Sequence, residues 1–140
     1  MKRNAVRRWR SFYGRQKMPP RKGWAAVYCR LSKEDEEKTA RESESIRNQR
    51  ELLLNWAQAH GYRVYRVYID EDYSGIDRER PAFRQLIADA EARQFDIVLV
   101  KTQSRFTRDM ELVEKYLHGK FVEWGIRFIA VVDHVDTADE

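Results

Sequence analysis

The segment DIVLVK, residues 96–101, is the clearest strand in this sequence, because an uninterrupted apolar run lies between charged residues. Such a run is typical of a parallel strand that is buried on both faces. Other segments with the length and composition of a strand occur at residues 24–30 (WAAVYCR), 62–69 (YRVYRVYI) and 127–132 (RFIAVV). Segments with helical spacing of apolar residues separate them, at residues 45–60, from Pro81 onward and at residues 110–124. This alternation predicts an α/β fold with a mostly parallel sheet of four to five strands, flanked by helices.

Charge is distributed unevenly along the 140 residues. Residues 1–23 contain nine Lys or Arg and no acidic residue, whereas residues 24–140 hold 18 basic and 23 acidic side chains, a net charge of −5. We expect residues 1–23 to form a flexible basic extension, which either holds phosphate groups without reading sequence or is simply a solvated leader. Residues 24–140 are expected to form one folded domain.

Composition narrows the class of protein. The longest apolar stretches have the length of a strand, so the sequence predicts no membrane span and no membrane partner. A single cysteine, Cys29, excludes an internal disulfide and is expected to be a buried core residue; with no secretory leader recognisable, a cytoplasmic protein is expected. The three histidines, His60, His118 and His134, show neither triad nor metal-ligand spacing and are expected to be structural or exposed.

The carboxyl ends of the strands predict a site. In a parallel α/β sheet ligands bind outside these ends. Ser32 follows the first strand, and the polar segments 70–80 and 102–108, expected to be loops like residues 33–43, follow the second and third. These segments should bring together Arg30, Ser32, Ser74, Arg80, Ser104, Arg105 and Arg108. Guanidinium groups match phosphate oxygens in a planar fork, so the pattern predicts a phosphate site that needs no metal.

Other interpretations stay open at this point. Serines after a strand often form turns or cap helices, which applies to Ser32, Ser74 and Ser104, and most arginines lie on surfaces. A metal-dependent nuclease would need clustered carboxylates at strand ends, which Asp70 and Asp72 could supply after the second strand; however, no acid closely follows the first strand, and the segment after the third offers only Asp109.

Five segments carry a family resemblance: YCRLSKEDE (residues 28–36), SIRNQRELL (from Ser45), YSGIDRERPAF (from Tyr73), VKTQSRFTRD (from Val100) and RFIAVVDHVDT (from Arg127). In this order, over residues 24–137, they resemble the catalytic domain of serine recombinases, and most of all the large transposon- and phage-type branch. The resemblance implies a resolvase-like fold with Ser32 as the nucleophile. It implies phosphate contacts for Arg30, Arg80, Arg105 and Arg108, and active-site surroundings that include Tyr28, Gln49, Ser74 and Ser104.

Two positions depart from the family's pattern. Many members carry aspartate where this chain has Ser104, and aspartate is common where Glu79 precedes Arg80. Both departures leave the arginines intact, but no acid–base role transfers to Ser104.

The resemblance also implies a function, site-specific DNA recombination through a 5′-phosphoserine intermediate that needs no cofactor, metal or ATP. The implied partners are double-stranded DNA and a homodimer that pairs into a tetramer on two DNA sites, in a cytoplasmic protein encoded by a bacterium, a phage or another mobile element. The alternative is a truncated remnant that dimerises with an intact recombinase and modulates it without cleaving DNA. In either case we expect the isolated chain to bind DNA weakly and largely through residues 1–23.

Overall fold

The computed structural model describes residues 19–31, 39–71 and 80–139, and a five-stranded sheet in the order β2–β1–β3–β4–β5 forms its centre. The strands are β1 (Trp24–Leu31), β2 (Arg63–Glu71), β3 (Ile97–Val100), β4 (Arg127–Ala130) and β5 (Val135–Asp136). The first four pair in parallel, and β5 runs antiparallel beside β4. The prediction of a mostly parallel sheet of four to five strands is confirmed.

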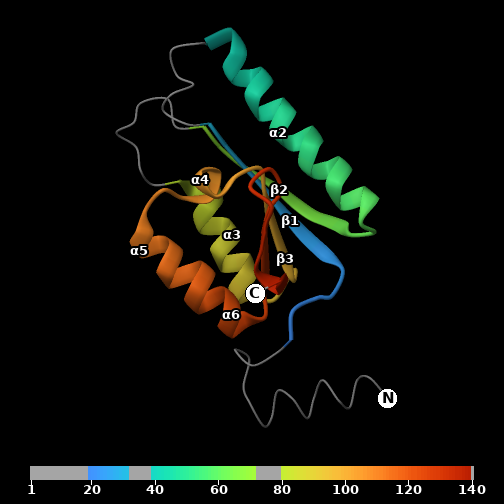
Figure 1. Ribbon diagram of the computed structural model, residues 1–140, viewed down its shortest axis with the longest axis vertical. Helices are drawn as coiled ribbons and strands as arrows, with labels where there is room; N and C mark the ends of the chain where they lie inside the picture. Colours follow the sequence, from blue (N-terminus) through green and yellow to red (C-terminus); the bar gives the residue numbers. More distant parts are fainter. Residues whose placement is uncertain (1–18, 32–38, 72–79, 140) are drawn as a thin grey trace.

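Helices cover both faces of this sheet. They are α2 (Thr39–Ala59), α3 (Pro81–Glu91), α4 (Gln103–Phe106), α5 (Met110–Leu112), the π-helix η3 (Val113–Lys120), α6 (Phe121–Trp124) and the short 3-10 helix η4 (Thr137–Asp139). Figure 1 shows α2 on one side of the sheet, and α3 with the stretch from α5 to α6 on the other. This is the layered arrangement that strands alternating with helices predict.

The pleat of β1 divides the core into two clusters, because successive side chains of a strand point to opposite faces. Ala26 and Tyr28 belong to the cluster beneath α3 and α6, whereas Val27 and Cys29 belong to the cluster beneath α2. The side chain of Cys29 is fully buried, as the sequence predicted. Residue 30 is therefore on the same face as Tyr28, which directs Arg30 toward the side of α3 and α4.

Three predicted loops were wrong in extent, and one predicted helix has an unexpected geometry. Asp70 and Glu71, expected to open the loop at 70–80, are the last residues of β2. Residues 39–43, expected to be part of a loop, are the first residues of α2. Thr39 is followed by Ala, Arg and Glu, which favour a helix. The many charged residues in this stretch therefore did not indicate a loop. The expected loop at 102–108 contains α4. The helix at 110–124 ends at Gly125 as predicted, with a positive φ of 73° that suits glycine, but its middle part is π-helical.

The end of the basic extension packs against the domain. The backbone N–H of Arg21 donates to the carbonyl of Arg93 (3.1 Å), and its guanidinium carbon lies 4.2 Å from the ring centroid of Trp24. The carbonyl of Gly23 accepts from the backbone of Arg63 (2.9 Å). The prediction for residues 1–18 lies outside the described residues. Within the described part, no helix combines the length and apolar character that crossing a membrane requires.

Candidate active site

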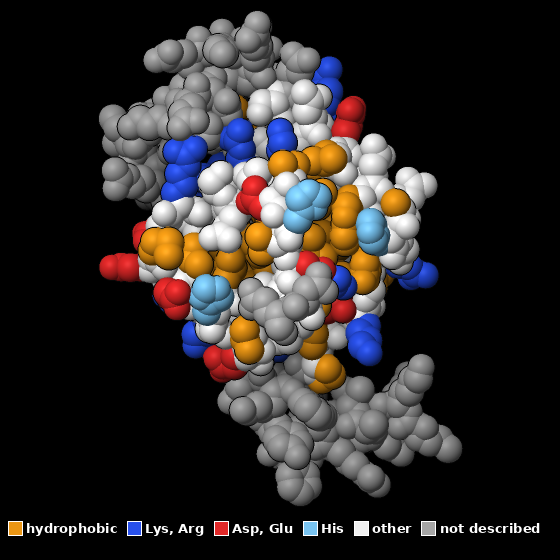
Figure 2. Space-filling view, viewed as in Figure 1, with side chains coloured by type: hydrophobic (Ala, Val, Ile, Leu, Met, Phe, Trp, Pro, Cys, Tyr) orange, Lys and Arg blue, Asp and Glu red, His pale blue; other side chains and the backbone are white. Residues whose placement is uncertain are grey.

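Arg30, the penultimate residue of β1, is hydrogen-bonded to the segment that follows β3. Its Nε donates to the carbonyl of Arg105 (2.9 Å), and a terminal nitrogen donates to the carbonyl of Ser104. Nη1 of Arg105 donates in return to the carbonyl of Arg30 (3.1 Å). Figure 2 shows Lys and Arg side chains gathered over the region where Figure 1 places α4. The predicted meeting of the first and third segments at one edge of the sheet is therefore present.

Gln49 joins α2 to this edge. Its side chain is fully buried, and its Oε1 accepts from the backbone N–H of Arg30 (3.2 Å) while its Nε2 donates to the carbonyl of the same residue (3.1 Å). A second acceptor of Nε2 is the hydroxyl of Ser45 (3.4 Å). The amide thus satisfies both backbone groups of Arg30, where β1 approaches its end.

Arg80 reaches the same edge from the start of α3. Its backbone is left-handed, with φ 46° and ψ 66°. One terminal nitrogen donates to the hydroxyl of Tyr28 (2.9 Å) and to the carbonyl of Phe106, which follows Arg105 at the end of α4. Arg80 therefore contacts residues of both β1 and α4, so guanidinium groups from three separate segments lie at one edge.

Asp70 is a residue of this site that the sequence did not assign correctly. Its carboxylate, in a residue 4% exposed, accepts from the Tyr28 hydroxyl (2.7 Å) and from the backbone N–H groups of Ala82 and Phe83 (2.9 Å each). These oxygens stabilise the start of α3, so Asp70 does not serve the metal-ion role that the nuclease alternative required. Within the described residues, no group of three or more His, Cys, Asp or Glu has the arrangement to hold a metal ion.

The electrostatics around Arg30 are dominated by positive charge. Burial lowers the pKa of the Arg30 guanidinium, and the nearby cations of Arg80, Arg105 and Arg108 lower this pKa further. A negative charge on Tyr28 would raise the pKa of Arg30. Burial, however, raises the pKa of the Tyr28 hydroxyl and keeps this hydroxyl neutral. Clustered like charges in a partly desolvated place repel each other, and a bound anion would relieve that repulsion. The geometry therefore suits phosphate.

The other predicted residues have different outcomes. Ser32, Ser74, Glu79 and Asp72 lie outside the described residues. The hydroxyl of Ser104 is 3.0 Å from that of Thr102, and Ser104 is no helix cap, because α4 begins at Gln103, before it, and Asp109 caps α5. His60, His118 and His134 are exposed, in line with the prediction. Burial raises the pKa of the Cys29 thiol to about 12, which makes it unreactive.

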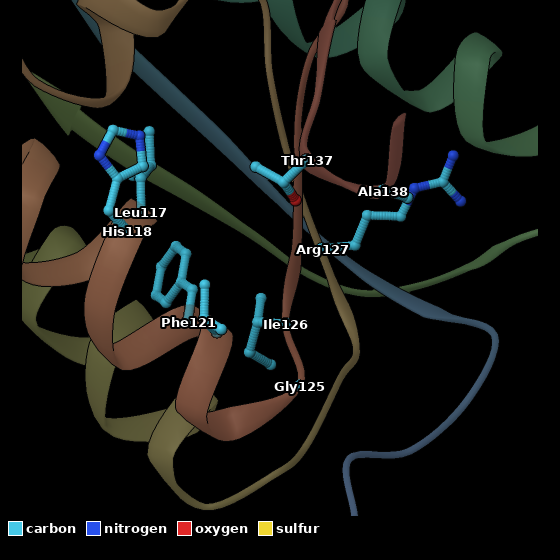
Figure 3. A pocket seen from close by; sticks show the side chains of 9 residues that line it. Leu117, His118, Phe121, Gly125, Ile126, Arg127, Thr137 and Ala138 are labelled. Carbon is cyan, nitrogen blue, oxygen red and sulfur yellow. The ribbon is translucent and has the colours of Figure 1, made fainter. Parts of the chain in front are cut away.

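A pocket that Arg30, Arg80 and Arg105 do not line offers different chemistry (Figure 3). Leu117, Phe121 and Ile126 give it an apolar wall, and it lies between the helical stretch η3–α6 and η4. Arg127 also lines it, but the guanidinium points away from Phe121 and is held by the carboxylate of Asp136 and the hydroxyl of Tyr62. Because the guanidinium of Arg127 is already paired with a carboxylate, the pocket is unsuited to phosphate.

Comparison with known proteins identifies the class. A family model described as "Resolvase, N terminal domain" matches residues 25–140. The N-terminal catalytic domain of TP901-1 integrase is 32% identical over 82% of each chain, with a TM-score of 0.65. The C-terminal catalytic domain of ISC1926 TnpA, an IS607-like serine recombinase, is 28% identical over 77% of this chain and 69% of its own, with a TM-score of 0.62.

A resolvase family site-specific recombinase from Streptococcus pneumoniae shares the fold, with a TM-score of 0.70 and 23% identity over 85% of this chain and 78% of its own. No curated protein sequence matches the chain. The fold, the arginines at its carboxyl edge and these similarities together define a catalytic domain of the serine recombinase class. The chain belongs to the resolvase family, of which it contains the N-terminal domain, and membership implies site-specific recombination, DNA binding and dimers.

Proposed function

We propose that this chain cleaves and rejoins DNA, with Ser32 as the nucleophile and Arg30, Arg80, Arg105 and Arg108 as the residues that bind the reacting phosphate. The observation that carries the proposal is the meeting of Arg30, Arg80 and Arg105 at one edge of the sheet, where their guanidinium groups are held by backbone carbonyls. Phosphoryl transfer is catalysed mainly by positioning and by neutralising charge on the phosphate oxygens. Several fixed guanidinium groups at one edge meet that requirement.

The reaction retains one phosphoester bond throughout. The Ser32 oxygen forms a bond to phosphorus and loses its proton, while the bond from phosphorus to the 3′ oxygen breaks and that oxygen gains a proton. The product is a 5′-phosphoserine link and a free 3′-hydroxyl, and attack by a 3′-hydroxyl reverses the step. Because the bond energy is retained, the reaction needs no ATP, and the arginines would neutralise the charge that a metal ion neutralises in other phosphoryl-transfer enzymes. The arginines stabilise the additional negative charge of the transition state.

The type of recombinase and its assembly are part of the same proposal. Likeness to the catalytic domain of an integrase and to that of an IS607-like serine recombinase supports a protein of a phage or a transposon. We propose that it acts on double-stranded DNA as dimers that pair into a tetramer. Tyr28, Gln49, Ser74 and Ser104 form the surroundings of the reacting groups.

Covalent capture tests this function. The chain is fused to a DNA-binding domain of known specificity, given paired sites, and quenched with denaturant; we expect protein joined to a 5′ end of DNA. The adduct should survive a chelator, disappear in Ser32→Ala and persist in Cys29→Ala, which removes a nearby but buried nucleophile. If a fusion that binds its sites gives no adduct across several core sequences, the chain is the non-cleaving remnant instead.

A further inference from the structure

We propose that Asp70 is a positioning residue for Arg80, holding both the backbone and the guanidinium of this arginine in the geometry that meets the phosphate. The proposal rests on the proposed function, and it assigns Asp70 neither a proton-transfer role nor a metal. Asp70 acts through two routes that start from the same carboxylate. One route passes through the start of α3 and the other through the hydroxyl of Tyr28.

The backbone route fixes where α3 begins. The first N–H groups of a helix have no partner within the helix and favour a negative charge beside them. Arg80 immediately precedes α3, and its side chain makes no capping hydrogen bond. The carboxylate of Asp70, which comes from β2, accepts from Ala82 and Phe83 instead. These hydrogen bonds attach the backbone at Ala82 and Phe83 to β2. Because Arg80 lies only two residues before Ala82, the position of its backbone is fixed as well.

The side-chain route fixes the guanidinium. Tyr28 and Asp70 lie diagonally on neighbouring strands, since Tyr28 pairs with Tyr68 and Arg30 pairs with Asp70. The Tyr28 hydroxyl donates to Asp70 (2.7 Å), so its oxygen is directed to accept from the terminal nitrogen of Arg80 (2.9 Å). The guanidinium carbon of Arg80 also lies 4.0 Å from the ring centroid of Phe83. Few rotamers of Arg80 satisfy all of these contacts.

The left-handed backbone of Arg80 shows that this geometry is imposed by its surroundings. A non-glycine residue at φ 46° is strained and persists only where neighbouring contacts determine it. The Nε of Arg80 is buried and has no hydrogen-bond partner among the described residues. The arginine is thus held in a costly arrangement, in which its buried Nε–H has no partner among the described residues and serves as a local probe of how tightly the side chain is held.

Two variants separate the routes, and a third is a matched control. Tyr28→Phe removes the side-chain route and leaves the hydrogen bonds of Asp70 to Ala82 and Phe83. Asp70→Asn disturbs both routes. Tyr68→Phe is the control, because its hydroxyl also donates to a carboxylate, that of Asp89 (2.6 Å), from a residue 2% exposed. It loses the same kind of bond on the same side of the sheet, and the arginine beside it is Arg66, which is not one of the proposed phosphate-binding residues.

The first readout does not depend on activity. In the unfused 140-residue chain, the Nε–H resonance of Arg80, assigned by its disappearance in Arg80→Lys, is followed by NMR. We expect its exchange with water to become at least about 10-fold faster in Tyr28→Phe, and unchanged in Tyr68→Phe. Asp70→Asn should show the same change if it folds. An unchanged resonance in Tyr28→Phe would overturn the proposal, whether or not the chain cleaves DNA.

The second readout is the rate of adduct formation in the fusion protein, together with thermal unfolding. We expect Tyr28→Phe to form adduct about 10- to 100-fold more slowly, the size of effect typical of a misplaced catalytic group, while Tyr68→Phe stays within about 2-fold of the parent. Both variants should lose similar stability. If the two slow the reaction equally, Tyr28 and Asp70 are merely structural and the inference is refuted. A parent protein that forms no adduct contradicts the proposed function alone, and the NMR result then decides the role of Asp70.

Discussion

Replacing Gln49 by methionine tests how the end of β1 is held. The substitution keeps the length of the side chain and removes both of its hydrogen-bonding atoms. It leaves the backbone N–H of Arg30 without its acceptor, because Oε1 of Gln49 is the partner that the structure gives it. The carbonyl of Arg30 loses one donor but retains the guanidinium of Arg105. Loss of the acceptor of the Arg30 N–H should therefore destabilise the domain more than loss of one of the two donors to the Arg30 carbonyl.

The magnitude follows from these contacts. A buried donor left without an acceptor costs about 1–3 kcal/mol, and the loss of one of two bonds to the carbonyl costs about 0.5–1.5 kcal/mol. Their sum is a destabilisation of about 2–4 kcal/mol, a large part of the stability of a domain of this size. With a slope near 2 kcal/mol/M, the midpoint of urea unfolding should fall by about 1–2 M.

Urea unfolding followed by circular dichroism measures the change, and Gln85→Met is the matched control. Gln85 is an exposed residue of α3, and its side-chain amide donates to the carboxylate of Asp89, which lies one turn later in the same helix (2.9 Å). We expect this control to change the free energy of unfolding by less than about 0.5 kcal/mol. If Gln49→Met were no more destabilising than Gln85→Met, the hydrogen bonds of Gln49 would not hold the end of β1, and the reasoning above would be refuted.

Three further predictions concern charge and backbone geometry. Asp136→Asn should lose about 1–2 kcal/mol of stability at pH 7, because two hydrogen bonds from Arg127 hold the pKa of this carboxyl below its usual value. The difference in the free energy of unfolding between parent and variant should have its full size above about pH 4, and it should disappear as the pH falls through the folded-state pKa of Asp136. Equal differences at pH 7 and pH 2 would contradict this prediction. Gly125→Ala should destabilise by more than Gly61→Ala, since both have positive φ but only the former places a new methyl group 3.3 Å from another side chain; thermal unfolding of the pair checks this, and equal losses would refute it. Arg30→Lys should slow adduct formation by about 10- to 100-fold, because an ammonium group cannot donate to two carbonyls in a planar fork, and an unchanged rate would show that its contacts to α4 do not matter.

Strands β1, β3 and β4 could be predicted from sequence because each contains an uninterrupted apolar run, and the start of α3 because Pro81 suits a first helical turn. The π-helix could not. Val113, Leu117 and Phe121 recur every four residues, a spacing compatible with either an α-helix or a locally widened one. Only the backbone hydrogen bonds distinguish the two, and no side-chain pattern reports them.

The positions of three arginines of the candidate site could be predicted from the sequence, but their hydrogen bonds could not. The rule for parallel sheets correctly brought Arg30, Arg80 and Arg105 to one edge, since it needs only the order of strands and loops. The contacts of Asp70 depend on the register between β1 and β2 and on the exact start of α3, which sequence periodicity leaves free by a residue or two. For the same reason the sequence offered Asp70 only as a carboxylate for the rival nuclease, when its partners are a hydroxyl and two backbone N–H groups.

The hydrogen bonds of these arginines explain how a cationic cluster can exist in a folded domain. Arg30 and Arg80 both donate to backbone carbonyls of α4, so each guanidinium attaches that short helix to the sheet while keeping its charge. These hydrogen bonds offset part of the cost of burial and of the repulsion between the arginines, the two effects that lower the pKa of Arg30. The cluster is therefore assembled by the fold before any phosphate arrives, and an anion bound there gains fixed positive charge without having to gather it. Such preorganisation is the property that electrostatic catalysis of phosphoryl transfer requires.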